Sequence, residues 1–160
     1  MSHAKLTYIK IIAVLEVAAG VWGISINIYV FLRYLIRNLM LSNLVVNFLA
    51  LIVNLMLLCA GMWLWANEDR GYHWSRILQA IQIPLLRTPL VTYQFISGMY
   101  STIIIGQGVQ FSFGFTHTGQ FGLLESGPVF LGINLIPILA LWCLRERIPT
   151  YEYLFGEEDK

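Results

Sequence analysis

Glu16 is the residue whose type and position are most informative about what this chain can do. It is the only charged side chain among the twenty-two residues from Ile11 to Leu32. About 20 apolar residues, at about 1.5 Å rise each, cross the hydrocarbon core of a bilayer, so this segment predicts a transmembrane helix. A carboxylate inside such a helix costs roughly 2.5–3.5 kcal/mol on insertion scales and usually faces protein or water. Glu16 therefore predicts a membrane protein whose first helix packs against another element.

The natural partner for this carboxylate is Arg87, which is also a lone charge in an apolar segment. Both would enter the membrane from the same side, and the long side chain of arginine lets its guanidinium reach toward the membrane interface. The sequence predicts a buried ion pair between Glu16 and Arg87. A contact of Arg87 with a lipid headgroup and a proton relay through Glu16 are the alternatives.

Small and polar residues form one stripe on each of the first two hydrophobic segments. Helical spacing places each stripe on a single face. Such stripes are typical of a packing seam, because small residues allow close approach and polar side chains hydrogen-bond across it. They would equally suit the lining of a polar path. The residues concerned are Glu16, Gly20, Gly23 and Asn27 in the first segment, and Asn43, Asn47 and Asn54 in the second.

The composition is that of an integral membrane protein. The 160 residues are 58% hydrophobic and 12% charged, whereas soluble domains are about 25% charged. The net charge of +1 argues against a nucleic-acid binder, since no basic stripe could neutralise phosphates. We expect one transmembrane domain over residues 1–160, an all-α bundle with four spans. These predicted spans are residues 11–32, 44–65, 77–105 and 128–144, with a tail over 145–160.

The third predicted span is irregular, because Pro84 and Pro89 interrupt it. Two interpretations remain open for residues 77–89. Either they begin a kinked span, or they form a helix at or partly within the membrane surface that is followed by a short span.

Residues 106–127 alternate aromatic and small polar side chains. A period of two predicts a strand, and Thr118–Gln120 could turn it into an extracytoplasmic β-hairpin. On this interpretation His117 is a solvent-exposed turn residue. A re-entrant loop is the alternative, because Gly106, Gln107 and Gly108 would let backbone carbonyls approach a permeant ion.

The charges of the loops predict the orientation. If four segments span, seven basic residues lie on the side of both termini, and only Arg33 and Arg37 lie on the other. The positive-inside rule then places both termini in the cytoplasm of a multi-pass cell-membrane protein. The seven are Lys5, Lys10, Arg70, Arg76, Arg145, Arg147 and Lys160.

No pattern of catalytic, metal-ligating or cofactor-binding residues accompanies these segments. We therefore expect a protein that is not an enzyme and that works by association in the lipid bilayer, either with copies of itself or as an accessory subunit of a larger membrane complex. The alternative is a small oligomeric channel or transporter whose path is lined by Glu16, Asn27 and the asparagine stripe.

Overall fold

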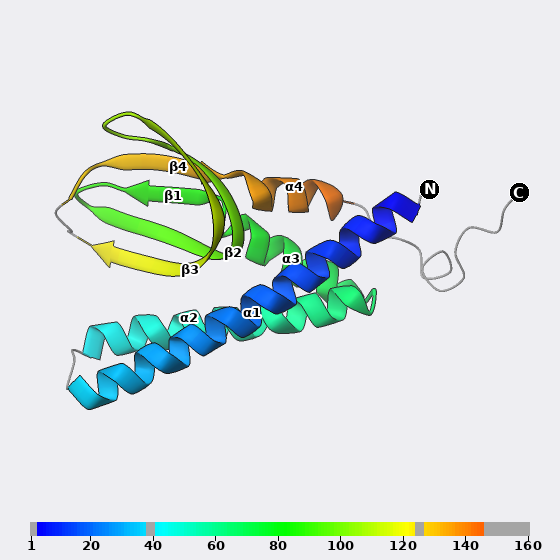
Figure 1. Ribbon diagram of the computed structural model, residues 1–160, viewed down its shortest axis with the longest axis horizontal. Coiled ribbons are helices and arrows are strands. Elements are labelled where there is room, and N and C mark those ends of the chain that lie inside the picture. Colours follow the sequence, from blue (N-terminus) through cyan, green and yellow to red (C-terminus); the bar gives the residue numbers. More distant parts are fainter. Residues whose placement is uncertain (1–2, 38–40, 124–126, 146–160) are drawn as a thin grey trace, which may run out of the picture.

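The computed structural model describes residues 3–37, 41–123 and 127–145. Two long antiparallel helices come first, α1 (His3–Arg37) and α2 (Leu41–Trp65), and a shorter helix follows, α3 (Asp69–Ala80). The strands β1 (Pro84–Arg87), β2 (Val91–Ile105), β3 (Val109–Leu123) and β4 (Phe130–Asn134) then lead into α4 (Leu135–Cys143). Figure 1 shows the sheet and α3 on one side of the α1–α2 pair.

Helices α1 and α2 approach closely because glycines lie between them. A Cβ added at Gly20 would meet the backbone of Leu58 at 2.8 Å, and one at Gly61 would meet the carbonyl oxygen of Ala13 at the same distance. Such contacts leave no room for a larger side chain at either position. The seam between the two helices therefore depends on residues without side chains.

The end of α2 turns the chain toward α3 through a left-handed residue. Asn67 has φ 58°, and the amide of Glu68 donates to the carbonyl of Trp63 at 2.9 Å. This arrangement satisfies carbonyls at the end of a helix and is one of the places where asparagine replaces glycine. Helix α3 then packs back along α2, with Tyr72, Ser75 and Gln79 among its buried residues.

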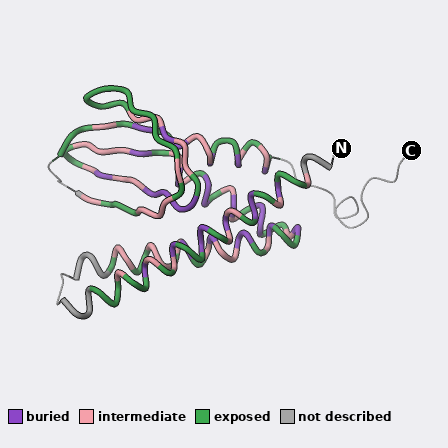
Figure 2. Tube along the Cα trace, viewed as in Figure 1, coloured by how far each residue is buried: buried purple, intermediate pink, exposed green. Residues whose placement is uncertain are grey.

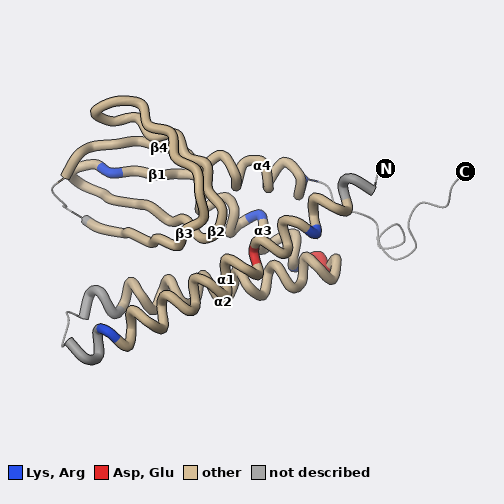
Figure 3. Tube along the Cα trace, viewed as in Figure 1, with Lys and Arg blue, Asp and Glu red and all other residues tan. Residues whose placement is uncertain are grey.

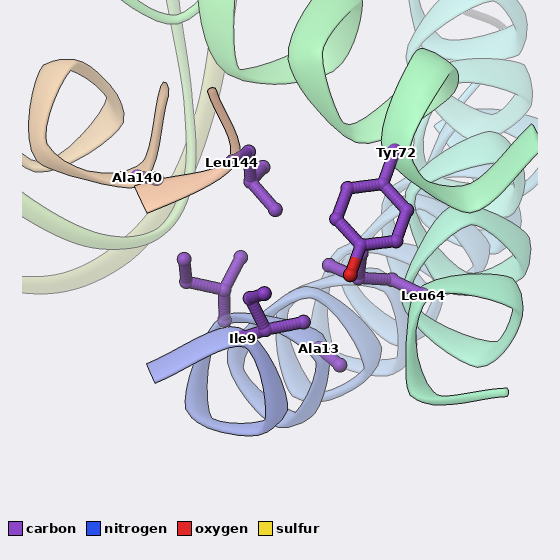
Figure 4. Close-up of a cluster of buried hydrophobic side chains, with 7 residues drawn as sticks. Ile9, Ala13, Leu64, Tyr72, Ala140 and Leu144 are labelled. Atoms are coloured by element: carbon purple, nitrogen blue, oxygen red, sulfur yellow. The ribbon is translucent and has the colours of Figure 1, made fainter. Parts of the chain in front are cut away.

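A core cluster lies where the four helices meet (Figure 4). It contains Ile9 and Ala13 of α1, Leu64 of α2, Tyr72 of α3 and Leu144, which directly follows α4. Arg76 of α3 closes the same region, because its guanidinium donates to the carbonyl oxygens of Leu144 and Arg145 at the end of α4. The cluster and this cap fix α4 against α1 and α3.

The sheet has the strand order β1-β4-β2-β3, with β1 also paired to β2. Strand β2 pairs with β3 along its whole length, from Val91↔Leu123 to Ile105↔Val109. Its other side pairs with β1 near one end and with β4 near the other, while β1 and β4 pair with each other. The sheet must curl to allow these pairings, and Figure 1 shows β2 and β3 curving around β1 and β4.

The curve of β2 comes close to α1 at Gly98. This residue has φ +99°, which side chains rarely tolerate, and an added Cβ would meet the Cβ of Ala19 at 2.8 Å. Figure 2 shows buried positions gathered where the sheet, α3 and the helix pair meet, while the free end of the β2–β3 hairpin is exposed. Gly98 and Ala19 thus set how near the sheet comes to the helices.

The prediction of an all-α bundle with four spans is wrong. The structure contains a four-stranded antiparallel sheet, and in the described part of the chain two helices, α1 and α2, are long and apolar enough to cross a membrane. Their qualifying stretches are Leu6–Arg33 and Val45–Trp65, which overlap the first two predicted spans.

Residues 77–105 form neither a kinked span nor a surface helix followed by a short span. They contain the end of α3, then β1 and β2. Pro84 begins β1, where the missing amide is tolerated, and Pro89 lies in the turn before β2. The fourth predicted span, residues 128–144, divides into β4 and a helix of 9 residues, which is too short to cross a bilayer.

The period of two in residues 109–116 does mark a strand, but the predicted turn is misplaced. Thr118–Gln120 lie inside β3, and the hairpin turns at Gly106–Gly108, where the amide of Gly106 donates to the carbonyl of Gly108. The predicted tail lies outside the described residues from position 146 onward.

We expect Gly98→Ala to lower the free energy of unfolding by about 2–4 kcal/mol, because it combines a left-handed backbone with a collision against Ala19. The matched control is Gly108→Ala in the hairpin turn, where an added Cβ meets nothing within 4 Å. Unfolding of both variants in detergent micelles measures the difference. Equal stabilities would mean that β2 does not bend onto α1 at this point.

Candidate functional site

Glu16 is held by two neutral side chains of α3. Ser75 Oγ donates to Oε2 at 2.7 Å, and Gln79 Nε2 donates to Oε1 at 2.9 Å. Ser75 and Gln79 are four residues apart and therefore share one face of the helix. Glu16 is only 2% exposed, and its carboxylate accepts these hydrogen bonds inside the protein.

A cavity of about 180 Å³ lies beside this carboxylate. Its wall is assembled from α1, α2, α3, β2 and α4, so elements from most of the chain converge on it. Apolar side chains make up most of the wall, and its acid and amide groups are Glu16, Gln79 and Gln82. We regard this cavity as the first part of the candidate functional site, and call it the Glu16 cavity.

Ser97 of β2 also lies on the wall of the Glu16 cavity and links it to a polar network. Its hydroxyl donates to Asn54 Oδ1 of α2 at 3.0 Å, and it lies 3.3 Å from His117 Nδ1 of β3. The other ring nitrogen of His117 lies 3.5 Å from the side-chain nitrogens of both Asn27 and Asn54. These groups connect the sheet to both long helices.

The network ends at a second cavity of about 480 Å³, between the α1–α2 pair and strands β1 and β3. Its wall includes the side chains of Asn27, Asn47, Arg87, His117 and Gln120. Asn47 Nδ2 donates to the backbone oxygen of Asn27 at 3.1 Å, which joins the two helices at this level. We call this space the His117 cavity.

Ser97 Oγ is buried, only 6% exposed, and lies among three hydrogen-bonding groups. Asn54 Oδ1 is 3.0 Å away, His117 Nδ1 is 3.3 Å away and the backbone oxygen of Ala19 is 3.4 Å away. These contacts tie β2 to α1, α2 and β3 and so help to position the sheet.

The two predicted stripes are brought together in part. Gly20 faces Leu58, Gly23 faces Asn54, and Asn27 meets Asn47, all between α1 and α2. Glu16 instead faces α3. Asn43 lies within α2, but its side chain is outside the described part of the structure.

The structure does not bring Glu16 and Arg87 together. Glu16 lines the Glu16 cavity and is hydrogen-bonded to side chains of α3. Arg87, at the end of β1, lines the His117 cavity. The proposed re-entrant residues Gly106, Gln107 and Gly108 are exposed at the turn of the β2–β3 hairpin, on the wall of neither cavity.

The side chains that the sequence analysis did not assign to the site are Ser75, Gln79, Gln82, Ser97 and His117. The i, i+4 spacing of Ser75 and Gln79 was a usable signal, because it marks a polar face on a short amphipathic helix. His117 was interpreted as a solvent-exposed turn residue, but it is a partly buried residue of β3. His117 continues the series Phe111, Phe113 and Phe115 at every second residue, and that spacing was the signal for a position inside the strand.

Within the residues that the structure describes, no group of three or more His, Cys, Asp or Glu side chains could hold a metal ion. Comparison with protein-family models, curated proteins and solved structures gives no match. The function must therefore be argued from the geometry of this chain.

Double-mutant cycles can test these contacts. Glu16→Gln and Arg87→Gln should change the free energy of unfolding additively, within about 0.3–0.5 kcal/mol, because the two residues line different cavities. Glu16→Gln and Gln79→Leu should instead be coupled by roughly 0.5–3 kcal/mol, because their side chains are in direct contact. Chemical unfolding in micelles gives both values. A strong coupling of Glu16 to Arg87 would contradict the separation of the two cavities.

Proposed function

We propose that this is a non-enzymatic protein of the cell membrane that works by association, as a homo-oligomer or as an accessory subunit of a larger membrane complex. The observation that carries the proposal is the open edge of β3. Three features of the chain indicate that this edge binds a partner chain: the depth of the sheet, its lack of charge and its strand order.

The first feature is depth. Ala19, which contacts Gly98 of β2, is near the middle of the apolar stretch Leu6–Arg33. If α1 crosses the bilayer, the contact is near the membrane midplane. Asn54 and Asn27, which meet Ser97 and His117, lie within the candidate spans too. The β2–β3 hairpin then lies at membrane depth beside the helices.

The second feature is the lack of charge. Strands β2, β3 and β4 contain no Asp, Glu, Lys or Arg. Figure 3 shows these strands almost uniformly tan, with most of the marked charges toward the ends of the molecule. Several exposed side chains of β3 are aromatic, with Phe111 74% and Phe113 71% exposed. This surface suits hydrocarbon or another apolar protein surface and not water.

The third feature is the strand order. β3 is at the edge of the sheet and, among the described strands, pairs with β2 alone. Its sequence has none of the lysines or prolines with which natural edge strands resist pairing. Open sheet edges do not occur in contact with lipid, because unpaired backbone groups cost several kcal/mol each there. His117–Phe121 of β3 face the α1–α2 pair across the His117 cavity, so the part of the edge that calls for a partner chain is the half toward the hairpin turn, where Phe111 and Phe113 are exposed.

For the orientation, we propose a two-span arrangement with the beginning of α1 and the α2–α3 turn on the cytoplasmic side. Lys10, Arg70 and Arg76 belong to that end, while Arg33 and Arg37 belong to the opposite end of α1. The positive-inside rule favours this direction, although by a smaller margin than with four spans.

A small oligomeric channel or transporter is the second candidate. It is favoured by the run of polar contacts from the Glu16 cavity through Ser97 and His117 to the His117 cavity. This run lies within a single chain, whereas the sequence analysis expected an oligomeric channel lined by Glu16, Asn27 and the asparagine stripe. A particle made of a symmetric ring of identical chains would favour this candidate.

The mass of the particle in mild detergent tests the association. We expect more than one chain in the wild-type particle, and we expect Phe111→Lys to release single chains, because a charge on β3 opposes its pairing. Trp142→Lys is the matched control, since Trp142 of α4 is also 74% exposed but is remote in sequence from β3. A wild-type particle with a single chain would contradict the proposal.

A further inference from the structure

We infer that the Glu16 cavity is a binding site for a small amphipathic cation, namely a primary ammonium group attached to a single ring or a short alkyl body. The cavity is mostly apolar but has one carboxylate on its wall, together with the amides of Gln79 and Gln82. An ammonium beside the carboxylate and a hydrocarbon body against the remaining wall would match this division. The inference does not depend on the association proposed above.

The carboxylate has room for such a partner. Ser75 and Gln79 each donate one hydrogen bond, to different oxygens of Glu16. An ionised carboxylate has about four acceptor sites, and an ammonium group carries three donors. Both present partners are neutral, and no described Lys or Arg forms a salt bridge with Glu16. A buried charge is costly unless it is paired, so a bound cation would supply what the site lacks.

The size of the cavity sets the size of the ligand. Its volume of about 180 Å³ is slightly larger than that of an engineered apolar cavity of about 150 Å³ that binds benzene. One aromatic ring with an aminomethyl group is therefore a suitable size.

The entrance of the cavity argues for an amphipathic ligand and not for a bare metal ion. Tyr8 and Ile11 of α1 and Leu139 of α4 line the cavity and are also exposed on the apolar outer surface. A ligand that enters there must first partition into an apolar phase. A hydrated metal ion would also find too few ligands, since no described group of three or more His, Cys, Asp or Glu side chains is present to replace its water.

Benzylammonium is the probe, and benzyl alcohol is its neutral analogue of similar size. Calorimetric titration of the full chain in non-ionic micelles should show benzylammonium binding at least about tenfold more tightly to the wild type than to Glu16→Gln, because a hydrogen bond to a charged group is worth roughly 1.5–3 kcal/mol. The affinity for benzyl alcohol should be nearly the same in both proteins. Glu68→Gln, which removes a more exposed carboxylate outside the cavity, is the matched control and should leave both affinities unchanged.

Two outcomes would overturn the inference. One is equal affinity of the wild type for the cation and the alcohol, which would indicate an apolar cavity that binds without regard to charge. The other is an equal loss in Glu68→Gln, which would indicate attraction of the cation to the protein surface.

A second measurement keeps the test decisive if Glu16→Gln fails to fold. Cys143 lies on the wall of the cavity, whereas Cys59 does not. In a Cys59→Ala protein, benzylammonium should slow the modification of Cys143 by a small membrane-permeant maleimide, and benzyl alcohol at the same concentration should slow it much less. Equal rates with and without the cation would exclude occupancy of the cavity.

Discussion

Strand β2 touches helix α1 where Gly98 rests on Ala19, and most of the remaining architecture depends on that contact. The left-handed backbone of Gly98 bends β2, and the bend lets a single strand pair with β1 near one end and β4 near the other. Beside it, the Ser97 hydroxyl lies 3.0 Å from Asn54 Oδ1, and the backbone N–H of Ser97 donates to Gln82 Oε1 at 2.9 Å. Polar groups buried at this contact would each cost roughly 1–3 kcal/mol if they were left unsatisfied. Close packing and hydrogen bonding therefore fix the sheet in the same place.

The sequence predicted the parts of the fold that local pattern controls. The two longest apolar runs became α1 and α2, and the alternation of Phe111, Phe113 and Phe115 marked a strand. The partner of that strand was not predictable in the same way. Residues 91–105 end in three isoleucines, and a short apolar run does not distinguish a buried strand from part of a helix. The two prolines and the β-branched residues of this region favour strands, whereas its hydrophobicity favours a membrane span.

The site shows the same division between local and distant information. The burial of Glu16 followed from its own neighbours in the sequence, but its partners came from a helix about sixty residues away. The attraction of opposite charges favours Arg87 as the partner, but in the structure two neutral donors of α3, Ser75 and Gln79, bind the carboxylate. The asparagines of α1 and α2 were recognised as a stripe, but their meeting with His117 required the sheet to lie against the helices. Contacts between residues so far apart in the sequence are set by tertiary packing, and they cannot be predicted from a short segment of the sequence.

The central claim is that the sheet lies at bilayer depth beside the two long helices, and the depth of β3 tests it most directly. A nitroxide can be attached at Phe113→Cys, or at Asp69→Cys at the start of α3 as the aqueous reference, with Cys59 and Cys143 replaced by alanine. In lipid bilayers, a water-soluble nickel chelate should relax the label at position 113 far less than the label at position 69. Equal relaxation at the two positions would place β3 in water and contradict the account.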